Sequence, residues 1–317
     1  MSAIFRRPRL FLAAALTRLI RCYRFDKGRR RLLWFMDSLL PAGAYSLEAR
    51  LAGGPVRIQC DRRDLLALRL FTFGEDEPHL YKLLRLAMSL SAEGHRVFVD
   101  VGANLGTMAI RLSRSFGCES ICFEPQPGLA KLLGENAACN GVADKLRIHQ
   151  IALADRSGDT PFFINPEHLG ESSIREIANS RKIVVPARRL DAVIAAEDWK
   201  RTVIVKVDVE GFEKEVFLGT SGLFALHRPP IVFEINQSAL RERNVAPSEV
   251  VEVLRTVGYT EFHAVEKCLF PPQNGVYPIA NIMAVTPEHA PLVRAYGFSE
   301  SFAARARKFL SVDPLQL

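Results

Sequence analysis

Five carboxylates stand where apolar runs of the sequence end, and their types and spacing could do chemistry. They are Asp100, Glu124, Asp208, Glu210 and Glu234. Apolar runs of this length are typical of buried strands, and the carboxyl ends of parallel strands form the ligand-binding edge of an α/β sheet. Five acids at such an edge predict a cleft of negative potential that suits a positively charged ligand.

The segment VIVKVDVEG at 203–211 carries three ionisable groups in one predicted strand. Alternate residues of a strand share a face, so Lys206, Asp208 and Glu210 would lie together as far as the strand persists. Such groups are costly to bury unless they are paired or functional. The segment therefore predicts a functional cluster, with a structural Lys–Asp pair under the next helix as the alternative.

A glycine turn follows the first of these apolar runs. The stretch VFVDVGANLG at 97–106 resembles a buried strand that turns at Gly102 and Gly106 into a helix, with Ala103 and Asn104 between. Free amides at the helix start would face a nucleotide-like cofactor. Glu124, after the second strand, stands where a ribose is held. The G-x-x-x-G spacing differs from the dinucleotide pattern G-x-G-x-x-G, and a plain strand-to-helix connection is the alternative.

Strands and helices alternate along most of the chain, which predicts a mostly parallel sheet covered on both faces. The segment 158–189 is irregular, and 170–173 reads as a surface turn or a substrate lid. The expected strands are 97–101, 119–124, 146–151, 203–209, 230–235, 259–264 and 280–286. The expected helices are 105–116, 127–140, 190–196, 212–219 and 247–257.

Six motifs in order resemble the FkbM family of S-adenosylmethionine-dependent methyltransferases. They are VDVGANLG at 99–106, FEPQP at 123–127, N-x-x-x-NG at 136–141, IALAD at 151–155, RLD at 189–191 and KVDVEGFE at 206–213. The resemblance is strongest over 95–236. It implies an α/β, Rossmann-like class I methyltransferase fold whose seven-stranded sheet is mainly parallel, with one antiparallel strand and helices on both faces.

The resemblance also implies where S-adenosylmethionine lies. Glu124 would bind the ribose hydroxyls, Pro125 and Gln126 would lie beside the adenosine, and Ala152 would lie near the adenine. The remaining cofactor contacts would come from the glycine turn: Asp100, Gly102, Ala103, Asn104 and Gly106.

The family is associated with O-methylation, so the expected acceptor is a hydroxyl of a saccharide, a glycolipid or a related metabolite. Such a hydroxyl needs a base or an electrophile. The expected catalytic residues are Asp208, Glu210 and Glu234, with Lys206 tuning their charge. In an alternative mechanism, Asp208, Glu234 and Asn236 hold Mg²⁺, which would lower the pKa of the acceptor hydroxyl. Three histidines are less favoured bases: His168, His227 and His263.

The chain divides into a basic helical arm at 1–54, a methyltransferase domain at 55–290 and a tail at 291–317. Net charge is +7, and only Asp26 opposes the ten Lys and Arg residues before residue 35. The arm is expected to pack on its own domain, or to contact an anionic membrane as a peripheral helix. Its apolar run at 10–16 is too short to span a bilayer, and a cleavage site after it is not evident.

The six cysteines form no C-x-x-C pair and no His cluster accompanies them, which suits reduced thiols and argues against zinc. The expected location is therefore the cytoplasm, with a peripheral position on the inner membrane surface as the alternative for the basic arm. Nucleic acid is not an expected partner. Two other functions stay open. One is a NAD(P)-dependent oxidoreductase, which the glycine spacing and the acids disfavour. The other is a non-catalytic scaffold that binds a membrane or partner.

Overall fold

A seven-stranded sheet forms the centre of the computed structural model, which describes residues 6–22, 28–41, 46–51, 56–75, 77–91, 94–166, 169–174, 176, 179–194, 196–265 and 279–298. The strand order is β11-β12-β10-β9-β3-β4-β5. β12 runs antiparallel to both β10 and β11, and the other pairs are parallel, which confirms the expected fold. The strands are β3 (Val97–Val101), β4 (Glu119–Phe123), β5 (Leu146–His149), β9 (Thr202–Val207), β10 (Ile231–Asn236), β11 (Glu261–Ala264) and β12 (Ile279–Val285).

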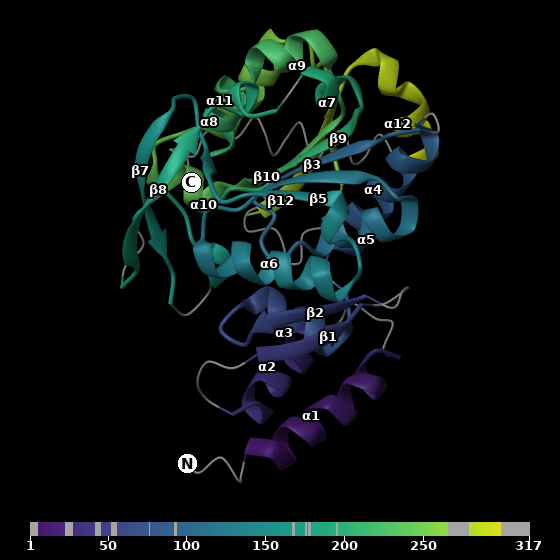
Figure 1. Ribbon diagram of the computed structural model, residues 1–317, viewed down its shortest axis with the longest axis vertical. Helices are drawn as coiled ribbons and strands as arrows, with labels where there is room; N and C mark the ends of the chain where they lie inside the picture. The colour runs from purple at the N-terminus through teal and green to yellow at the C-terminus, as the bar shows by residue number, and fades with distance from the viewer. Residues whose placement is uncertain are drawn as a thin grey trace.

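Helices cover both faces of this sheet because its strands are apolar on both sides. Phe98 and Ile204 belong to the core that packs on α4 (Pro78–Leu90), α5 (Thr107–Phe116) and α6 (Pro127–Cys139). Val99 and Val205 belong to the opposite core, under α8 (Glu213–Leu218), α9 (Ser221–His227) and α11 (Pro247–Thr256). Figure 1 shows α6 and α9 on opposite sides of the sheet.

Shorter elements complete the domain. The helices are α7 (Ala196–Lys200), α10 (Gln237–Glu242) and α12 (Ala290–Tyr296), which packs on α4. The 3₁₀ turns are η2 (Ala143–Lys145), η3 (Leu169–Glu171), η4 (Leu190–Ala192) and η5 (Pro287–His289). The expected helix at 190–196 was wrong, because this segment forms η4 and then leads into α7. The expected tail at 291–317 is described as far as residue 298, and this part contains most of α12.

The N-terminal elements form a layer of their own beside α6 (Figure 1). They are α1 (Arg6–Ile20), α2 (Arg29–Leu39), β1 (Ser46–Arg50), β2 (Arg57–Asp61) and α3 (Leu65–Phe73). β1 pairs antiparallel with β2, so the expected boundary between 54 and 55 falls between two bonded strands. Asn136 and Asn140 of α6 hydrogen-bond to β2 of this layer. Asn136 Oδ1 accepts from the Gln59 amide at 2.7 Å, and Asn140 Nδ2 donates to the Arg57 carbonyl at 2.7 Å.

A second sheet takes up the two ends of the segment at 158–189 that was expected to be irregular. Its order is β6-β8-β7, with β6 (Ala152–Leu153), β7 (Gly158–Ile164) and β8 (Arg181–Arg188). β7 and β8 pair antiparallel over their whole length in register. This sheet stands beside the carboxyl ends of the central strands (Figure 1), where it supplies one wall of the candidate site. Among the described helices, none combines the length and the apolar content needed to cross a bilayer.

Candidate active site

The turn after β3 brings two backbone segments into direct contact. Gly102 has φ +76°, and a Cβ there would lie 1.7 Å from the Asp208 carbonyl oxygen. The Asp208 amide in turn donates to the Val101 carbonyl at 3.0 Å. Only glycine leaves room for this approach, so Gly102 fixes the loop after β3 against the loop after β9.

The amides of this turn are bonded within the protein, whereas the expectation that free amides at the start of α5 face a ligand stays a prediction. The Gly102 and Ala103 amides both donate to the Phe123 carbonyl at 3.0 Å, and the Gly106 amide donates to the Ala103 carbonyl at 2.8 Å. The Asn104 amide donates to Glu124 Oε2 at 2.9 Å. These four amides are therefore not free to bind a pyrophosphate, the group that a dinucleotide would place beside this turn.

Glu124 is held at the end of β4 by two backbone amides. Its Oε2 accepts from Asn104, and its Oε1 accepts from the Gln126 amide at 2.9 Å. Burial raises the pKa of Glu124 to about 7, although these two hydrogen bonds oppose the rise. Each oxygen retains acceptor capacity. The carboxylate lines the cavity and is fixed in position to accept hydrogen bonds from a ligand.

A cavity of about 230 Å³ lies at the carboxyl ends of β3, β4, β9 and β10. It gathers most of the residues expected to bind cofactor, namely Asp100, Gly102, Ala103, Asn104, Glu124, Pro125 and Ala152. Gly106 and Gln126 do not line it. Gly106 stands at the N-terminus of α5. Gln126 Oε1 accepts from the Leu129 amide at 3.1 Å to cap α6, while its Nε2 donates to the Leu169 carbonyl at 3.3 Å.

Asp100 is a buried carboxylate with spare acceptor capacity. Its Oδ1 has no hydrogen-bond partner among the described residues, and Lys206 Nζ lies 3.9 Å from it. Burial raises the pKa of Asp100 to about 6. The positive charge of Lys206 opposes this rise, and the negative charge of Asp208 adds to it. A cationic ligand group beside Asp100 would compensate this charge.

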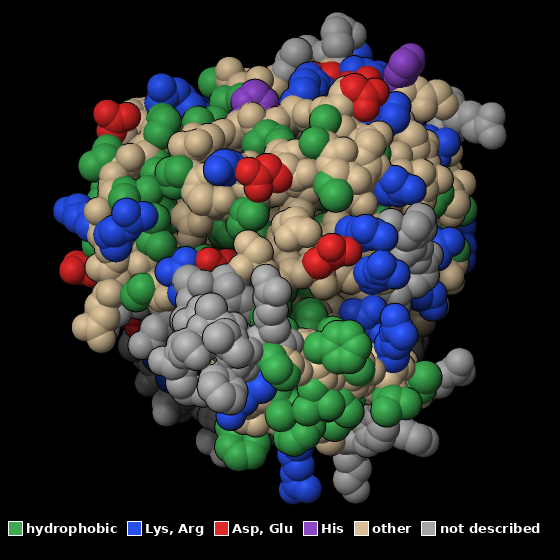
Figure 2. Space-filling model, turned by 60° about the horizontal axis from the view of Figure 1, so that its bottom comes forward, with side chains coloured by type: hydrophobic (Ala, Val, Ile, Leu, Met, Phe, Trp, Pro, Cys, Tyr) green, Lys and Arg blue, Asp and Glu red, His purple; other side chains and the backbone are tan. Residues whose placement is uncertain are grey.

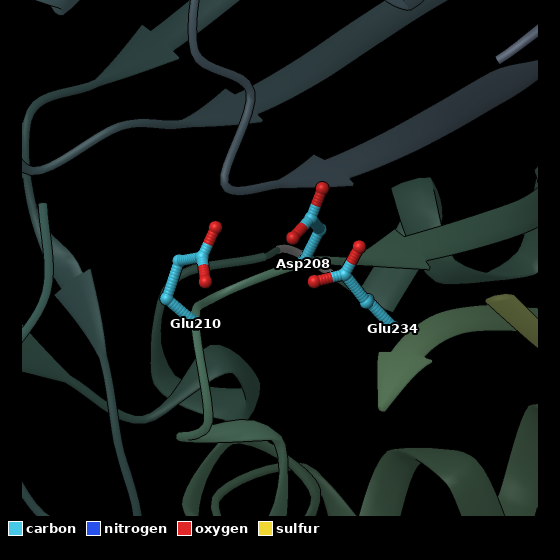
Figure 3. Close-up of side chains that lie close together, drawn as sticks. All are labelled: Asp208, Glu210 and Glu234. Atoms are coloured by element: carbon cyan, nitrogen blue, oxygen red, sulfur yellow. The ribbon is translucent and has the colours of Figure 1, made fainter. Parts of the chain in front are cut away.

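Three carboxylates converge at the ends of β9 and β10. Asp208, Glu210 and Glu234 each offer an oxygen, and these atoms lie within 4.8 Å of one another. Figure 3 shows Glu210 and Asp208 on the loop after β9 and Glu234 on β10, with their carboxylates directed toward a common space. Negative charges this close to one another repel. Burial, followed by the charges of Asp208, Glu210 and Glu77, raises the pKa of Glu234 well above its ordinary value.

Lys206 is the buried cation of this cluster. Its Nζ donates to Asp208 Oδ2 at 3.0 Å. Burial alone would lower the pKa of Lys206, but Asp208, Asp100 and Glu77 outweigh it and the pKa lies above its ordinary range. Lys206 therefore stays protonated and holds Asp208 as its counterion.

Asn236, expected as a metal ligand beside Asp208 and Glu234, makes two hydrogen bonds within the protein. Asn236 Oδ1 accepts from the Ala239 amide at 3.2 Å as the cap of α10, and its Nδ2 donates to Glu210 Oε2 at 3.3 Å. Glu210 joins Asp208 and Glu234 as expected, although β9 ends at Val207 and Glu210 itself has a left-handed backbone conformation (φ +54°).

Glu213 supports the loop that carries Asp208 and Glu210. Its Oε1 accepts from the Gly211 amide at 3.1 Å and from the Val209 amide at 3.3 Å. Burial raises the pKa of Glu213 to about 7, against these bonds. The motif KVDVEGFE contained this residue, but a strand-period argument gives no signal for a carboxylate that folds back onto its own loop.

Other cavity residues come from segments that the sequence analysis did not assign to the site. Asp64 caps α3, Arg69 lies on α3, and Glu77 begins α4 with its Oε1 accepting from Asn281 Nδ2 at 2.9 Å. Leu169, Gly170, Ser172 and Ile174 also line the cavity, so the proposed lid segment contributes to its wall. Neither His227 nor His263 lines this cavity, and His168 lies outside the described residues.

The family model described as "Methyltransferase FkbM domain" matches residues 100–261. Two curated proteins are similar to this chain. Methyltransferase sdnD of Sordaria araneosa is 27% identical over 152 residues, covering 38% of this chain and 59% of its own length. Hexuronic acid methyltransferase AglP of Haloferax volcanii is 30% identical over 138 residues, covering 43% of this chain and 54% of its own length.

The chain thus spans between half and two thirds of both curated relatives. Among solved structures, a methyltransferase FkbM from Methylobacillus flagellatus KT aligns with a TM-score of 0.42 at 13% identity. That alignment covers 68% of this chain and 52% of the other chain.

Proposed function

Because the chain belongs to the FkbM methyltransferase family, we propose that it transfers the methyl group of S-adenosylmethionine to a hydroxyl oxygen of a saccharide or related metabolite. The observation that carries this proposal is one cavity that joins a fixed ribose acceptor, Glu124, to a carboxylate cluster containing Glu234. The two groups supply the two requirements of the reaction, which are cofactor binding and a base.

The residues present fit the cofactor. Glu124 would hold the ribose hydroxyls, and Oδ1 of Asp100, which accepts no hydrogen bond from the described residues, would face a cationic part of the molecule. An apolar wall suits the adenine, and it is formed by Pro125, Leu129, Ile151, Ala152 and Leu153. Bound there, S-adenosylmethionine supplies a methyl group activated by a positively charged sulfur.

Glu234 is the proposed general base. Its raised pKa makes its ionised form a stronger base than an ordinary glutamate. As the acceptor oxygen forms its bond to the methyl carbon and the carbon–sulfur bond breaks, Glu234 would take the hydroxyl proton. Lys206 keeps Asp208 in place and limits the repulsion that Glu234 meets on ionising.

The same three carboxylates also suit a hard divalent cation such as Mg²⁺, whose preferred ligands are oxygens. Lys206 already binds Asp208, so a cation there would compete with it, and we favour the metal-free base. Dialysis against EDTA leaves turnover unchanged on this account. Loss of turnover, restored by Mg²⁺, would establish the metal-dependent alternative.

The acceptor class follows from the charges in the cavity and from the curated relatives. Arg69 and Lys206 are the cations among its described lining residues. Since the relative AglP is a hexuronic acid methyltransferase, uronic-acid saccharides are the first acceptors to test, and Arg69 of the cavity wall would bind their carboxylate.

The experiment is a transfer assay with methyl-labelled S-adenosylmethionine and three acceptor sets: uronic-acid saccharides, neutral saccharides and an RNA control. We expect label on a saccharide oxygen. Glu234→Gln should abolish turnover while the cofactor affinity is retained, because the base is lost and Glu124 is untouched. Transfer that persists at the wild-type rate in Glu234→Gln would eliminate this residue as the base.

A further inference from the structure

The outer side of α1 is apolar although the helix is packed on the protein. Its inward side carries Ala13, Thr17 and Ile20, which are buried. Its exposed side carries apolar residues at intervals of four, three and four, which places them on one stripe of the helix. They are Pro8, Leu12, Ala15 and Leu19. Phe11, beside this stripe, is 79% exposed. A soluble surface helix normally turns such a stripe inward, so this side has no partner within the described chain.

The outer side of α2 continues the same surface. Its exposed residues Arg31, Trp34, Phe35 and Ser38 recur at helical spacing, while Met36 is buried. Trp34 is 76% exposed. Because α1 and α2 contact each other, the two exposed sides form one surface, which we call the arm face.

The arm face concentrates the apolar exposure of the molecule. Half of the large apolar side chains that stand exposed in the described chain belong to it: Phe11, Leu12, Leu19, Trp34 and Phe35. Figure 2 shows hydrophobic side chains gathered toward the lower edge of the view, with Lys and Arg beside them. A contiguous apolar patch of this kind marks an interaction site.

The charges of the arm face select one kind of partner. Arg9, Arg18 and Arg31 are exposed, and α1 contains no acid. The one acid of α2, Asp37, pairs with Arg62 at 2.6 Å. Arginines beside Trp, Phe and Leu, without competing acids, complement the anionic headgroups and the acyl boundary of a bilayer. Trp and Tyr favour that boundary.

From this arrangement we infer that the arm face docks on an anionic lipid bilayer, with α1 and α2 lying in the plane of the surface. Helix α3 connects α1 and α2 to the candidate site. It packs on both helices and lines the cavity with Leu65, Leu66 and Arg69. The inference goes beyond the proposed function and does not depend on it, because vesicle binding needs neither cofactor nor acceptor.

The test is co-sedimentation of the full chain with phosphatidylcholine vesicles and with vesicles containing 30% phosphatidylglycerol. We expect binding to the anionic vesicles only. Arg18→Ser/Arg31→Ser should lower partitioning by roughly 25-fold, about 5-fold for each arginine lost. Phe11→Ser/Trp34→Ser should lower it at least as much, because the inserted apolar area is lost.

Matched control variants separate docking from general surface effects. Leu226 on α9 is 72% exposed, and Arg156 is exposed beside β7. Leu226→Ser and Arg156→Ser should bind anionic vesicles as the wild type does, and thermal melting of every variant checks that the fold persists. Equal binding to neutral vesicles, or no binding to either kind, would overturn the inference. Sedimentation of the wild type as a dimer that Phe11→Ser/Trp34→Ser dissociates, without vesicle binding, would instead assign the arm face to self-association.

Discussion

Glu124→Gln is the substitution that most sharply separates cofactor binding from folding. The glutamine side chain has the same shape, but its amide nitrogen must face either the Asn104 or the Gln126 amide, which now both donate to carboxylate oxygens. A buried amide left unpaired costs about 1–3 kcal/mol. Against this, glutamine avoids the cost of ionising a carboxylate whose pKa burial has raised to about 7. The two effects oppose each other, so the fold should survive.

Cofactor affinity should fall clearly in the same variant. A hydrogen bond to a charged group contributes about 1.5–3 kcal/mol, so loss of the charged ribose acceptor predicts roughly 10- to 150-fold weaker binding of S-adenosylmethionine. Calorimetric titration at pH 8, where Glu124 is ionised in the wild type, measures this directly. Wild-type affinity should also weaken as the pH falls through about 7, because Glu124 becomes protonated, whereas the variant should lose this change near pH 7 and retain only the change near pH 6 that Asp100 causes.

The control for this prediction is Glu135→Gln, an exposed glutamate on the same α6 helix that Gln126 caps. It should bind the cofactor as the wild type does. An unchanged dissociation constant in Glu124→Gln, with the protein folded, would refute the ribose role of Glu124.

Two further substitutions test the backbone and the loop of the site. Gly102→Ala should lower the unfolding midpoint by more than Gly117→Ala does. Both glycines have positive φ, which costs an L-residue about 1–2 kcal/mol, but of the two only Gly102 would place its Cβ against a neighbouring backbone atom. Equal midpoints would refute the close approach. Glu213→Gln should retain both amide bonds, since Val209 and Gly211 donate to one oxygen. The pKa of Glu213 is raised to about 7, so its ionisation destabilises the folded state as pH rises from about 4.5 through 7. Urea unfolding should therefore show the variant gaining stability relative to the wild type between pH 5 and pH 8, and an equal difference at both pH values would contradict this.

The sheet was predictable because its apolar runs and glycine turns are local patterns. The carboxylates Asp100, Glu124, Asp208 and Glu234 follow such runs, and the parallel topology brings them to one edge. The position of Glu210 in the cluster with Asp208 and Glu234 could not be derived from strand alternation alone. Strand alternation stops at Val207, and the left-handed turn that redirects Glu210 has no period-two signal.

The remaining differences arise from tertiary contacts. β7 and β8 each contain a proline, Pro161 and Pro186, and much of their length is exposed, so their sequences lack the buried alternation of the central strands. Asp64 and Glu77 reach the cavity only because α3 and α4 pack near the end of the sheet. The occupation of the turn amides likewise depends on where β4 places the Phe123 carbonyl.

The most direct test of methyl-donor binding is parallel calorimetric titration of the full chain with S-adenosylmethionine, S-adenosylhomocysteine and NAD⁺. We expect the first two to bind at one site per chain and NAD⁺ not to bind, because the amides of the glycine turn are bonded to Phe123 and Glu124. Binding of NAD⁺ without S-adenosylmethionine would contradict the central claim.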